Sequence, residues 1–211
     1  IGRFHRLRMM ESANPELSWG DMAVLYRTNA QSRAIEESLV RWGIPYIVVG
    51  GLRFYDRREI KDLLAYLRLL VNPADTVSLL RVINVPKRGI GKTTIQRLTD
   101  AANQLGIPLW DVVSDAEAVR SLGGRSAKGL LQFCELLNDL RLRVQDAAPS
   151  ELIQQVMEKS GYVAELITEG TDEAEERRRN LQELVNAALQ YQEENDEGAV
   201  SYTHLTLPTS R

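Results

Sequence analysis

The run Met22-Ala-Val-Leu-Tyr26 decides the fold of the first part of the chain, because it is continuously apolar. Such a run predicts a short strand that is buried on both faces, as in a parallel sheet. Ile35, Leu39 and Trp42 then recur at helical spacing, and Ile44-Pro-Tyr-Ile-Val-Val49 returns to β-branched and aromatic residues. Strand, helix and strand within about 30 residues have the size of one βαβ unit. We therefore expect an α/β N-terminal part with a parallel sheet.

Helical spacing dominates the rest of the chain. Apolar residues from Ile60 to Val71 follow a helical period until Asn72-Pro73 ends it. Further helices are predicted between glycine and proline interruptions, at Val77–Val82, Thr93–Gln104, Leu109–Val113, Ala127–Val144, Glu151–Lys159 and Glu173–Gln192. The expected fold class is therefore an α/β part followed by a mainly α-helical region, mostly helical overall. The change is expected near Ser121-Leu-Gly-Gly124.

The composition is that of an ordinary globular protein. The 211 residues carry a formal net charge of −3, and 44% are hydrophobic and 26% charged. No apolar run approaches the ~18 residues of a membrane span, and the N-terminus lacks the pattern of a secretory signal. We expect a cytoplasmic protein without membrane contact. The chain starts at Ile1 instead of Met, which indicates a piece of a longer protein.

Cysteine and histidine indicate no metal site. Cys134, the single cysteine, lies in the apolar phase of a predicted helix, so we expect a buried, reduced thiol. His5 and His204 lie at opposite ends of the chain and belong to no cluster with ligand spacing. No metal ligand is predicted.

Charge is distributed unevenly along the chain. Five bases and no acid occur from Arg81 to Arg97, whereas Glu165 to Glu197 is dominated by acids. Within the basic stretch, Gly91-Lys-Thr-Thr94 has the end of a phosphate-binding P-loop. Pro86, however, occupies the position where that motif needs its first glycine. A P-loop is therefore excluded, and the basic stretch must be explained in another way.

Arg88-Gly-Ile-Gly-Lys-Thr-Thr94 opens a predicted helix in the manner of a helix-hairpin-helix turn. Glycines let the backbone approach a phosphate, and the helix N-terminus offers N–H groups and the positive end of its dipole. Such a turn binds a nucleic-acid backbone without reading bases. The other interpretation is a tight turn without a ligand. Weaker copies of the pattern occur at Gly123-Gly-Arg-Ser-Ala-Lys128 and Ser160-Gly-Tyr162. The candidate DNA contacts are Arg88, Gly89, Ile90, Gly91, Lys92, Thr93, Gly123, Gly124, Arg125, Ser126, Lys128, Ser160, Gly161 and Tyr162.

Tyr26 ends the first predicted strand and Arg27 begins the loop after it, at the edge where α/β sheets bind ligands. A tyrosine can stack on a base, and an arginine can hold a phosphate with its planar fork of donors. The alternative is that Tyr26 packs internally and that Arg27 pairs with Glu36 or Glu37. Chemistry alone slightly favours this alternative.

Four blocks of the sequence, taken together, resemble one family. They are Asp21-Met-Ala-Val-Leu-Tyr-Arg-Thr-Asn-Ala-Gln-Ser-Arg33, Val49-Gly-Gly-Leu-Arg-Phe-Tyr-Asp-Arg-Arg-Glu-Ile-Lys-Asp62, Leu64-Ala-Tyr-Leu-Arg68 and Asn84-Val-Pro-Lys-Arg-Gly-Ile-Gly91. The chain closely resembles the UvrD/PcrA type of superfamily 1 DNA helicases, in order from about residue 4 to Val200. The first block resembles motif IV and the second the motif called IVa.

The resemblance implies a place for each part of the chain. Residues 1–120 resemble the first part of the second RecA-like domain, called 2A, with an incomplete parallel sheet. Residues 121–200 resemble the start of the inserted helical domain, called 2B. Residues 201–211 resemble a translated sequencing adaptor and are expected to be a non-native tail.

The resemblance also implies an activity, namely 3′→5′ unwinding of DNA driven by ATP with Mg²⁺. Tyr26 would flank the adenine and Arg27, as a catalytic residue, would reach the γ-phosphate. The Walker A lysine and the Walker B acids are absent from the chain, and the magnesium ligands would lie in the first RecA-like domain, the expected partner besides DNA. We expect the chain alone to be inactive. The alternative is a stand-alone helical module that binds DNA or protein without ATPase activity.

Overall fold

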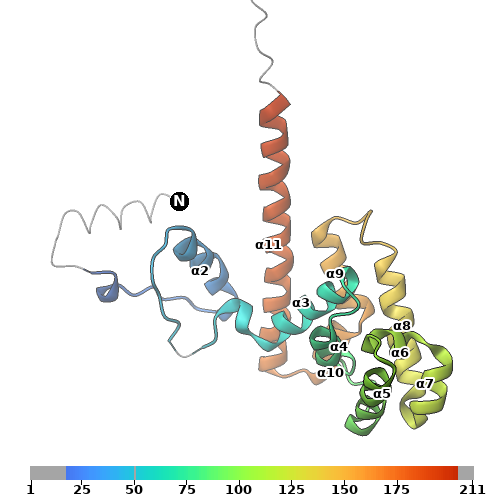
Figure 1. The fold of residues 1–211 in the computed structure, drawn as a ribbon. Helices are drawn as coiled ribbons and strands as arrows, with labels where there is room; N and C mark the ends of the chain where they lie inside the picture. Colours follow the sequence, from blue (N-terminus) through green and yellow to red (C-terminus); the bar gives the residue numbers. More distant parts are fainter. Residues whose placement is uncertain (1–17, 50, 204–211) are drawn as a thin grey trace, which may run out of the picture. The chain divides into compact units, whose positions relative to one another are not determined.

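The computed structural model describes residues 18–49 and 51–203 of the chain. Contacts divide the chain into two units, Ile1–Arg57 and Arg58–Arg211, here called unit 1 and unit 2. The domain boundary that the sequence predicts near residue 121 lies inside unit 2, and it stays a prediction. Figure 1 traces the helices that make up both units.

The predicted α/β class is wrong, because no strand occurs among the residues that the structure describes. The described part of unit 1 contains three single 3₁₀ turns and one helix: η1 (Trp19–Asp21), η2 (Asn29–Gln31), α2 (Ser32–Arg41) and η3 (Phe54–Asp56). The helix matches the predicted one. The two runs expected as strands, 22–26 and 44–49, belong to no helix and to no sheet.

The error over these two runs has a physical reason. An apolar run becomes a strand only when a neighbouring strand pairs with its backbone and other elements cover its side chains. The runs at 22–26 and 44–49 do not pair with each other, and Leu25 remains 94% exposed and Ile47 84% exposed. The apolar pattern predicted burial in a sheet, but the described residues contain no sheet and leave much of both runs exposed.

Within the described residues, all regular elements of unit 2 are helices. Its helices are α3 (Arg58–Val71), α4 (Thr76–Val82), α5 (Lys92–Leu105), α6 (Leu109–Ser114), α7 (Ala116–Leu122), α8 (Ala127–Arg141), α9 (Pro149–Lys159), α10 (Tyr162–Glu169) and α11 (Asp172–Thr203), with the 3₁₀ turn η4 (Gly124–Ser126) before α8. The helices expected from the sequence are all present. Two helices, α7 and α10, were not predicted.

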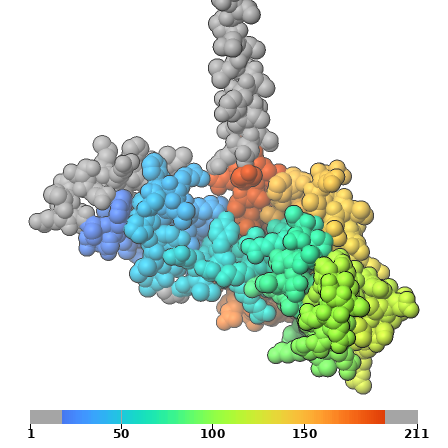
Figure 2. All heavy atoms as spheres, viewed as in Figure 1, coloured from blue at the N-terminus to red at the C-terminus, as the bar shows by residue number. Residues whose placement is uncertain are grey.

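Helix α3 lies at the centre of unit 2, where it packs against α4, α8, α9 and α11. Its apolar face, which includes Ile60, Leu63 and Leu69, is fully buried. The neighbouring helices α5 to α8 pack in succession against one another, and Figure 2 shows them, in green to yellow, gathered at one end of the unit. The first half of α11 packs against α3, α9 and α10 through Leu181 and Val185.

Local sequence fixes the ends of these helices. Asp75 caps α4 by accepting a hydrogen bond from the backbone N–H of Ser78, and Asp115 caps α7 in the same way. Helix α5 ends at Gly106, whose φ of 66° is left-handed, as helix C-caps often are. Helix α11 continues to Thr203, and the rest of the predicted non-native tail lies outside the described residues.

Candidate nucleic-acid interface

The three glycine-containing segments predicted to contact DNA converge in unit 2. The Ser126 hydroxyl donates to the Gly89 carbonyl at 2.8 Å, although 37 residues separate the two. The Thr94 hydroxyl, in the first turn of α5, lies 3.3 Å from the same Ser126 oxygen. Arg88 donates to the Ser160 carbonyl at 3.1 Å, over 72 residues of sequence. Hydrogen bonds therefore bring the starts of α5, α8 and α10 to one place.

The packing of α8 against the Arg88 segment is also very close. A Cβ built on Gly129 would lie 2.3 Å from the Arg88 carbonyl oxygen, well inside the distance that real Cβ atoms show. A glycine at this position of α8 is therefore required by the approach of the two backbones, since any side chain would push them apart.

The turn before α5 is fixed by hydrogen bonds to the Asn84 side chain and by a buried Ile90, while its two glycines are exposed to solvent. The Asn84 side-chain oxygen accepts from the backbone N–H groups of Arg88 and Ile90, at 2.7 and 3.2 Å. Ile90 is 2% exposed, and Gly89 has a left-handed φ of 71°. No side chain caps α5, whose N-cap is Gly91. A helix start without a cap leaves N–H groups that can bind an anion.

The structure separates the predicted contacts into an exposed set and a set of buried or half-buried residues, here called the framework. The exposed members are Gly89, Gly91, Lys92, Thr93, Gly124, Arg125 and Lys128. The buried members are Ile90, Gly123, Ser126, Ser160 and Tyr162, while Arg88 and Gly161 are half-buried. A buried side chain can shape the surface but presents little of itself to a ligand. Each of these residues stays a predicted DNA contact.

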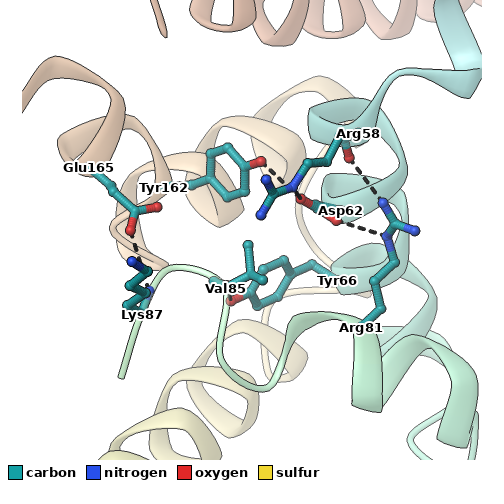
Figure 3. A network of polar contacts seen from close by, with 8 residues as sticks. All are labelled: Arg58, Asp62, Tyr66, Arg81, Val85, Lys87, Tyr162 and Glu165. Atoms are coloured by element: carbon teal, nitrogen blue, oxygen red, sulfur yellow. Dashed lines mark hydrogen bonds and ion pairs between the residues drawn. The ribbon is translucent and has the colours of Figure 1, made fainter. Parts of the chain in front are cut away.

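The framework includes a polar cluster on α3 that the sequence analysis missed. The Tyr162 hydroxyl donates to Asp62 at 3.0 Å, and Arg81 of α4 binds the other oxygen of this buried carboxylate at 2.8 Å (Figure 3). Burial and the carboxylate of Asp62 raise the pKa of Tyr162 well above its ordinary value. One turn along α3, the Tyr66 hydroxyl donates to the Val85 carbonyl and accepts from Arg88.

One signal for this cluster was present in the sequence. Asp62 and Tyr66 are four residues apart, so they lie on one face of α3, among the apolar residues that form its buried stripe. A polar residue in a buried stripe needs a hydrogen-bond partner, which would have marked both residues as framework. The hydrogen-bond partners Val85 and Tyr162, however, lie 19 and 100 residues further along the chain.

The exposed set carries unpaired positive charge. Lys92, Arg125 and Lys128 form no ion pair among the described residues. One acid lies beside the turn before α5: Glu165, in the first turn of α10, accepts from the Lys87 backbone N–H at 3.4 Å (Figure 3). The electrostatics of the convergent surface therefore favour an anion, and Glu165 opposes it.

Unit 1 places the two residues predicted for a nucleotide at the end of an apolar run. Tyr26 is half-buried and lines a pocket of about 830 Å³, whose other walls include Trp19, Ile35 and Ile44. Arg27 is exposed, and its backbone N–H donates to the Gln31 side chain at 3.0 Å.

The alternative partners of Arg27 are engaged elsewhere. Glu37 binds Arg33 at 2.6 Å, and Glu36 accepts from the Phe54 N–H at 3.2 Å. No ion pair joins Arg27 to either glutamate among the residues that the structure describes. The Arg27 side chain is therefore accessible to a ligand, and its role at a phosphate stays a prediction.

The described ranges contain no cluster of three potential metal ligands, and no helix in them is both long and apolar enough to cross a bilayer. Cys134 is buried as predicted, and its thiol donates to the Val113 carbonyl at 2.9 Å. Burial raises the pKa of this thiol to about 12, which makes it a poor nucleophile.

Comparison with known proteins decides the family. The family model of the UvrD-like helicase C-terminal domain matches residues 5–205. This chain belongs to that family. It is 41% identical over 173 residues to the ATP-dependent DNA helicase PcrA of Staphylococcus aureus, a match that covers 82% of the chain and 24% of the relative. PcrA of Leuconostoc citreum is 39% identical over 175 residues, covering 83% and 23%.

The resemblance found in the four sequence blocks is thereby confirmed. The chain spans about a quarter of the length of the curated relatives that it matches. Within the chain, the convergence of three helix starts is the geometric feature that the family match alone does not describe.

Glu165 provides a first test of the electrostatics of this UvrD-like domain. Glu165→Gln removes the acid beside the α5 turn but keeps an oxygen that can accept from the Lys87 N–H. We expect duplex DNA to bind about two- to fivefold more tightly at low salt, with the gain lost at high salt through screening. Fluorescence anisotropy at two salt concentrations measures this change. Glu151→Gln, in the first turn of α9, removes the same charge and should have little effect on DNA affinity.

Proposed function

We propose that this chain is a segment of an ATP-dependent DNA helicase that contributes a γ-phosphate arginine and a surface for the DNA backbone. The family match and the PcrA relatives support this proposal. The single observation that carries the DNA part is the convergence of the starts of α5, α8 and α10. Backbone contacts gain affinity by number, so one surface with several helix starts binds more strongly than scattered turns.

On the nucleotide side, we propose that Tyr26 lies against the adenine and that Arg27 reaches the γ-phosphate of ATP. The half-buried ring beside an apolar pocket fits a stacked base, and an exposed guanidinium fits a phosphate. ATP bound with Mg²⁺ would supply the free energy for unwinding. This chain would hold the nucleotide from one side, while the first RecA-like domain of the helicase supplies the magnesium ligands. A cytoplasmic location and 3′→5′ polarity belong to the same proposal.

On the DNA side, two kinds of group hold the phosphates. The uncapped start of α5 presents backbone N–H groups, and the exposed Lys92, Arg125 and Lys128 of the converging segments supply cations. Both kinds of group recognise phosphate oxygens, which carry no sequence information. We therefore expect binding that is independent of base sequence and sensitive to salt.

A double substitution tests this surface. Arg125→Ala with Lys128→Ala should weaken duplex binding, and the slope of log affinity against log salt should fall by up to about 1.8, since each neutralised phosphate contributes ~0.9. Duplex affinity across a salt series, with wild type and variant side by side, measures both quantities. Duplexes of two unrelated sequences should give the same result.

The matched control lies at the other end of α8. Arg141→Ala with Arg143→Ala removes the same charge from exposed positions and should leave the slope nearly unchanged. If the Arg125 and Lys128 variant binds with wild-type affinity and slope, these glycine-containing segments only turn the chain. The DNA part of the proposal is then wrong.

A further inference from the structure

Arg88 is the residue at which the convergent segments meet, and its guanidinium is surrounded by protein acceptors. Nη1 donates to the Val82 and Pro86 carbonyls at 3.3 and 3.1 Å. Nη2 donates to the Tyr66 hydroxyl at 2.7 Å and to the Ser160 carbonyl at 3.1 Å. The guanidinium also lies over the Phe133 ring, 5.3 Å from its centroid. The side chain thus contacts α3, α4, α8 and the end of α9 at once.

These contacts leave Arg88 poorly equipped to bind a phosphate. A guanidinium has five N–H donors, and a phosphate is bound best by two parallel ones. Both terminal nitrogens of Arg88 already have two acceptors each. Only the single Nε–H remains, so the fork that makes arginine a phosphate ligand is occupied inside the protein.

The backbone of Arg88 is fixed as firmly as its side chain. Its N–H donates to Asn84, and its carbonyl lies against Gly129 of α8. Tyr66, the acceptor on α3, is fully buried and therefore cannot contact DNA itself. Burial raises the pKa of Tyr66 to about 12, so its hydroxyl keeps its proton and can donate to Val85 while it accepts from Arg88.

We propose that Arg88 is a positioning residue, which aligns the start of α5 with the start of α10 on the DNA-contacting surface, with Tyr66 as its buried anchor. This proposal rests on the proposed function, since it concerns the same surface. It assigns to Arg88 a role different from that of Lys92, Arg125 and Lys128, which face solvent. Loss of the Arg88 side chain weakens DNA binding by displacing these other residues, not by removing a phosphate contact.

The test compares variants of the 211-residue chain that separate charge from geometry. Arg88→Lys keeps the positive charge but loses the fork, and Tyr66→Phe removes only the anchoring hydroxyl. Both should weaken duplex binding by about tenfold, because each breaks hydrogen bonds to a charged group. The double variant should be little weaker than either single one, since both remove the same connection. Arg141→Lys, at an exposed position of α8, is the matched control and should bind normally.

Amide hydrogen exchange gives a second measurement that does not depend on DNA. In both single variants, exchange should rise about tenfold in the segments 87–93 and 161–164, which the Arg88 side chain links. Exchange in the buried parts of α3 and α11 should stay at the wild-type level. That comparison shows whether a variant is folded, so general unfolding cannot be mistaken for the local effect.

Two results would overturn the positioning role. If Arg88→Lys binds like wild type and Arg88→Met lowers the salt slope by ~0.9, Arg88 is a phosphate ligand. If both single variants keep wild-type exchange and affinity, Arg88 positions nothing. In either case a wild-type chain that binds duplex in a salt-dependent manner leaves the proposed function intact. A wild-type chain that binds no duplex overturns both proposals.

Discussion

Arg27→Ala in a full-length helicase that contains this segment should lower the rate of ATP turnover by ~10³–10⁵, the usual effect of losing an arginine that stabilises the transferring phosphoryl group. The side chain of Arg27 is exposed, and the two glutamates that could have neutralised it are bound by Arg33 and by the Phe54 N–H. Steady-state ATP hydrolysis at saturating DNA measures the effect. DNA binding should change little, because the convergent surface belongs to unit 2.

The control for this substitution is another exposed arginine of unit 1. Arg41→Ala, in the last turn of α2, removes the same charge and should hydrolyse ATP at a normal rate. Arg27→Lys should restore only a small part of the activity, because an ammonium group lacks the planar fork of a guanidinium. Near-normal turnover in Arg27→Ala would mean that Arg27 is an ordinary surface residue.

Gly129→Ala should destabilise the chain by ~1–3 kcal/mol, the usual cost of adding a methyl group to a fully packed site. The new Cβ would lie 2.3 Å from the Arg88 carbonyl oxygen and 3.3 Å from the Arg88 Cβ. Alanine in a helix is normally favoured over glycine by ~0.5–1 kcal/mol, so the steric effect must exceed that gain. Urea denaturation followed by far-UV circular dichroism gives the free energy of unfolding.

A comparison with Gly91→Ala separates the steric conflict from the mere addition of a methyl group. Gly91 has no other atom within 4 Å of its ideal Cβ position, so this substitution meets no steric conflict. It should cost less than about 1 kcal/mol, as a change of N-cap residue does. If Gly129→Ala proves as stable as wild type or more so, the close approach of α8 to Arg88 does not constrain this position.

The helices could be predicted from the sequence because their signals are local. Apolar residues at helical spacing in α3, and capping or stop signals around α4 and α5, lie within the element that they define. Helix α10 was not predicted, because Ser160-Gly-Tyr162 was interpreted only as a weaker copy of the turn before α5. In the structure, glycines with left-handed φ flank this helix at Gly161 and Gly170, and two glycines nine residues apart leave room for two helical turns.

Strands and burial could not be predicted in the same way, because both depend on partners distant in sequence. The apolar run at 22–26 indicates a need for neighbours but does not supply them. Tyr162 was predicted as a DNA contact on its position after a glycine. Its hydroxyl is held by Asp62, 100 residues earlier, in the interior of unit 2. No local pattern shows that these two residues meet.

The uncapped turn at Gly89–Gly91 has a consequence for movement along DNA. Phosphates repeat identically at every nucleotide, so a surface that holds them through N–H groups and cations has the same free energy at each step. On the proposed surface, the energy landscape along the strand is therefore periodic, without deep minima at particular sequences. A helicase that uses the proposed surface would meet equal barriers throughout, and the supply of ATP, instead of the base sequence, would set its pace.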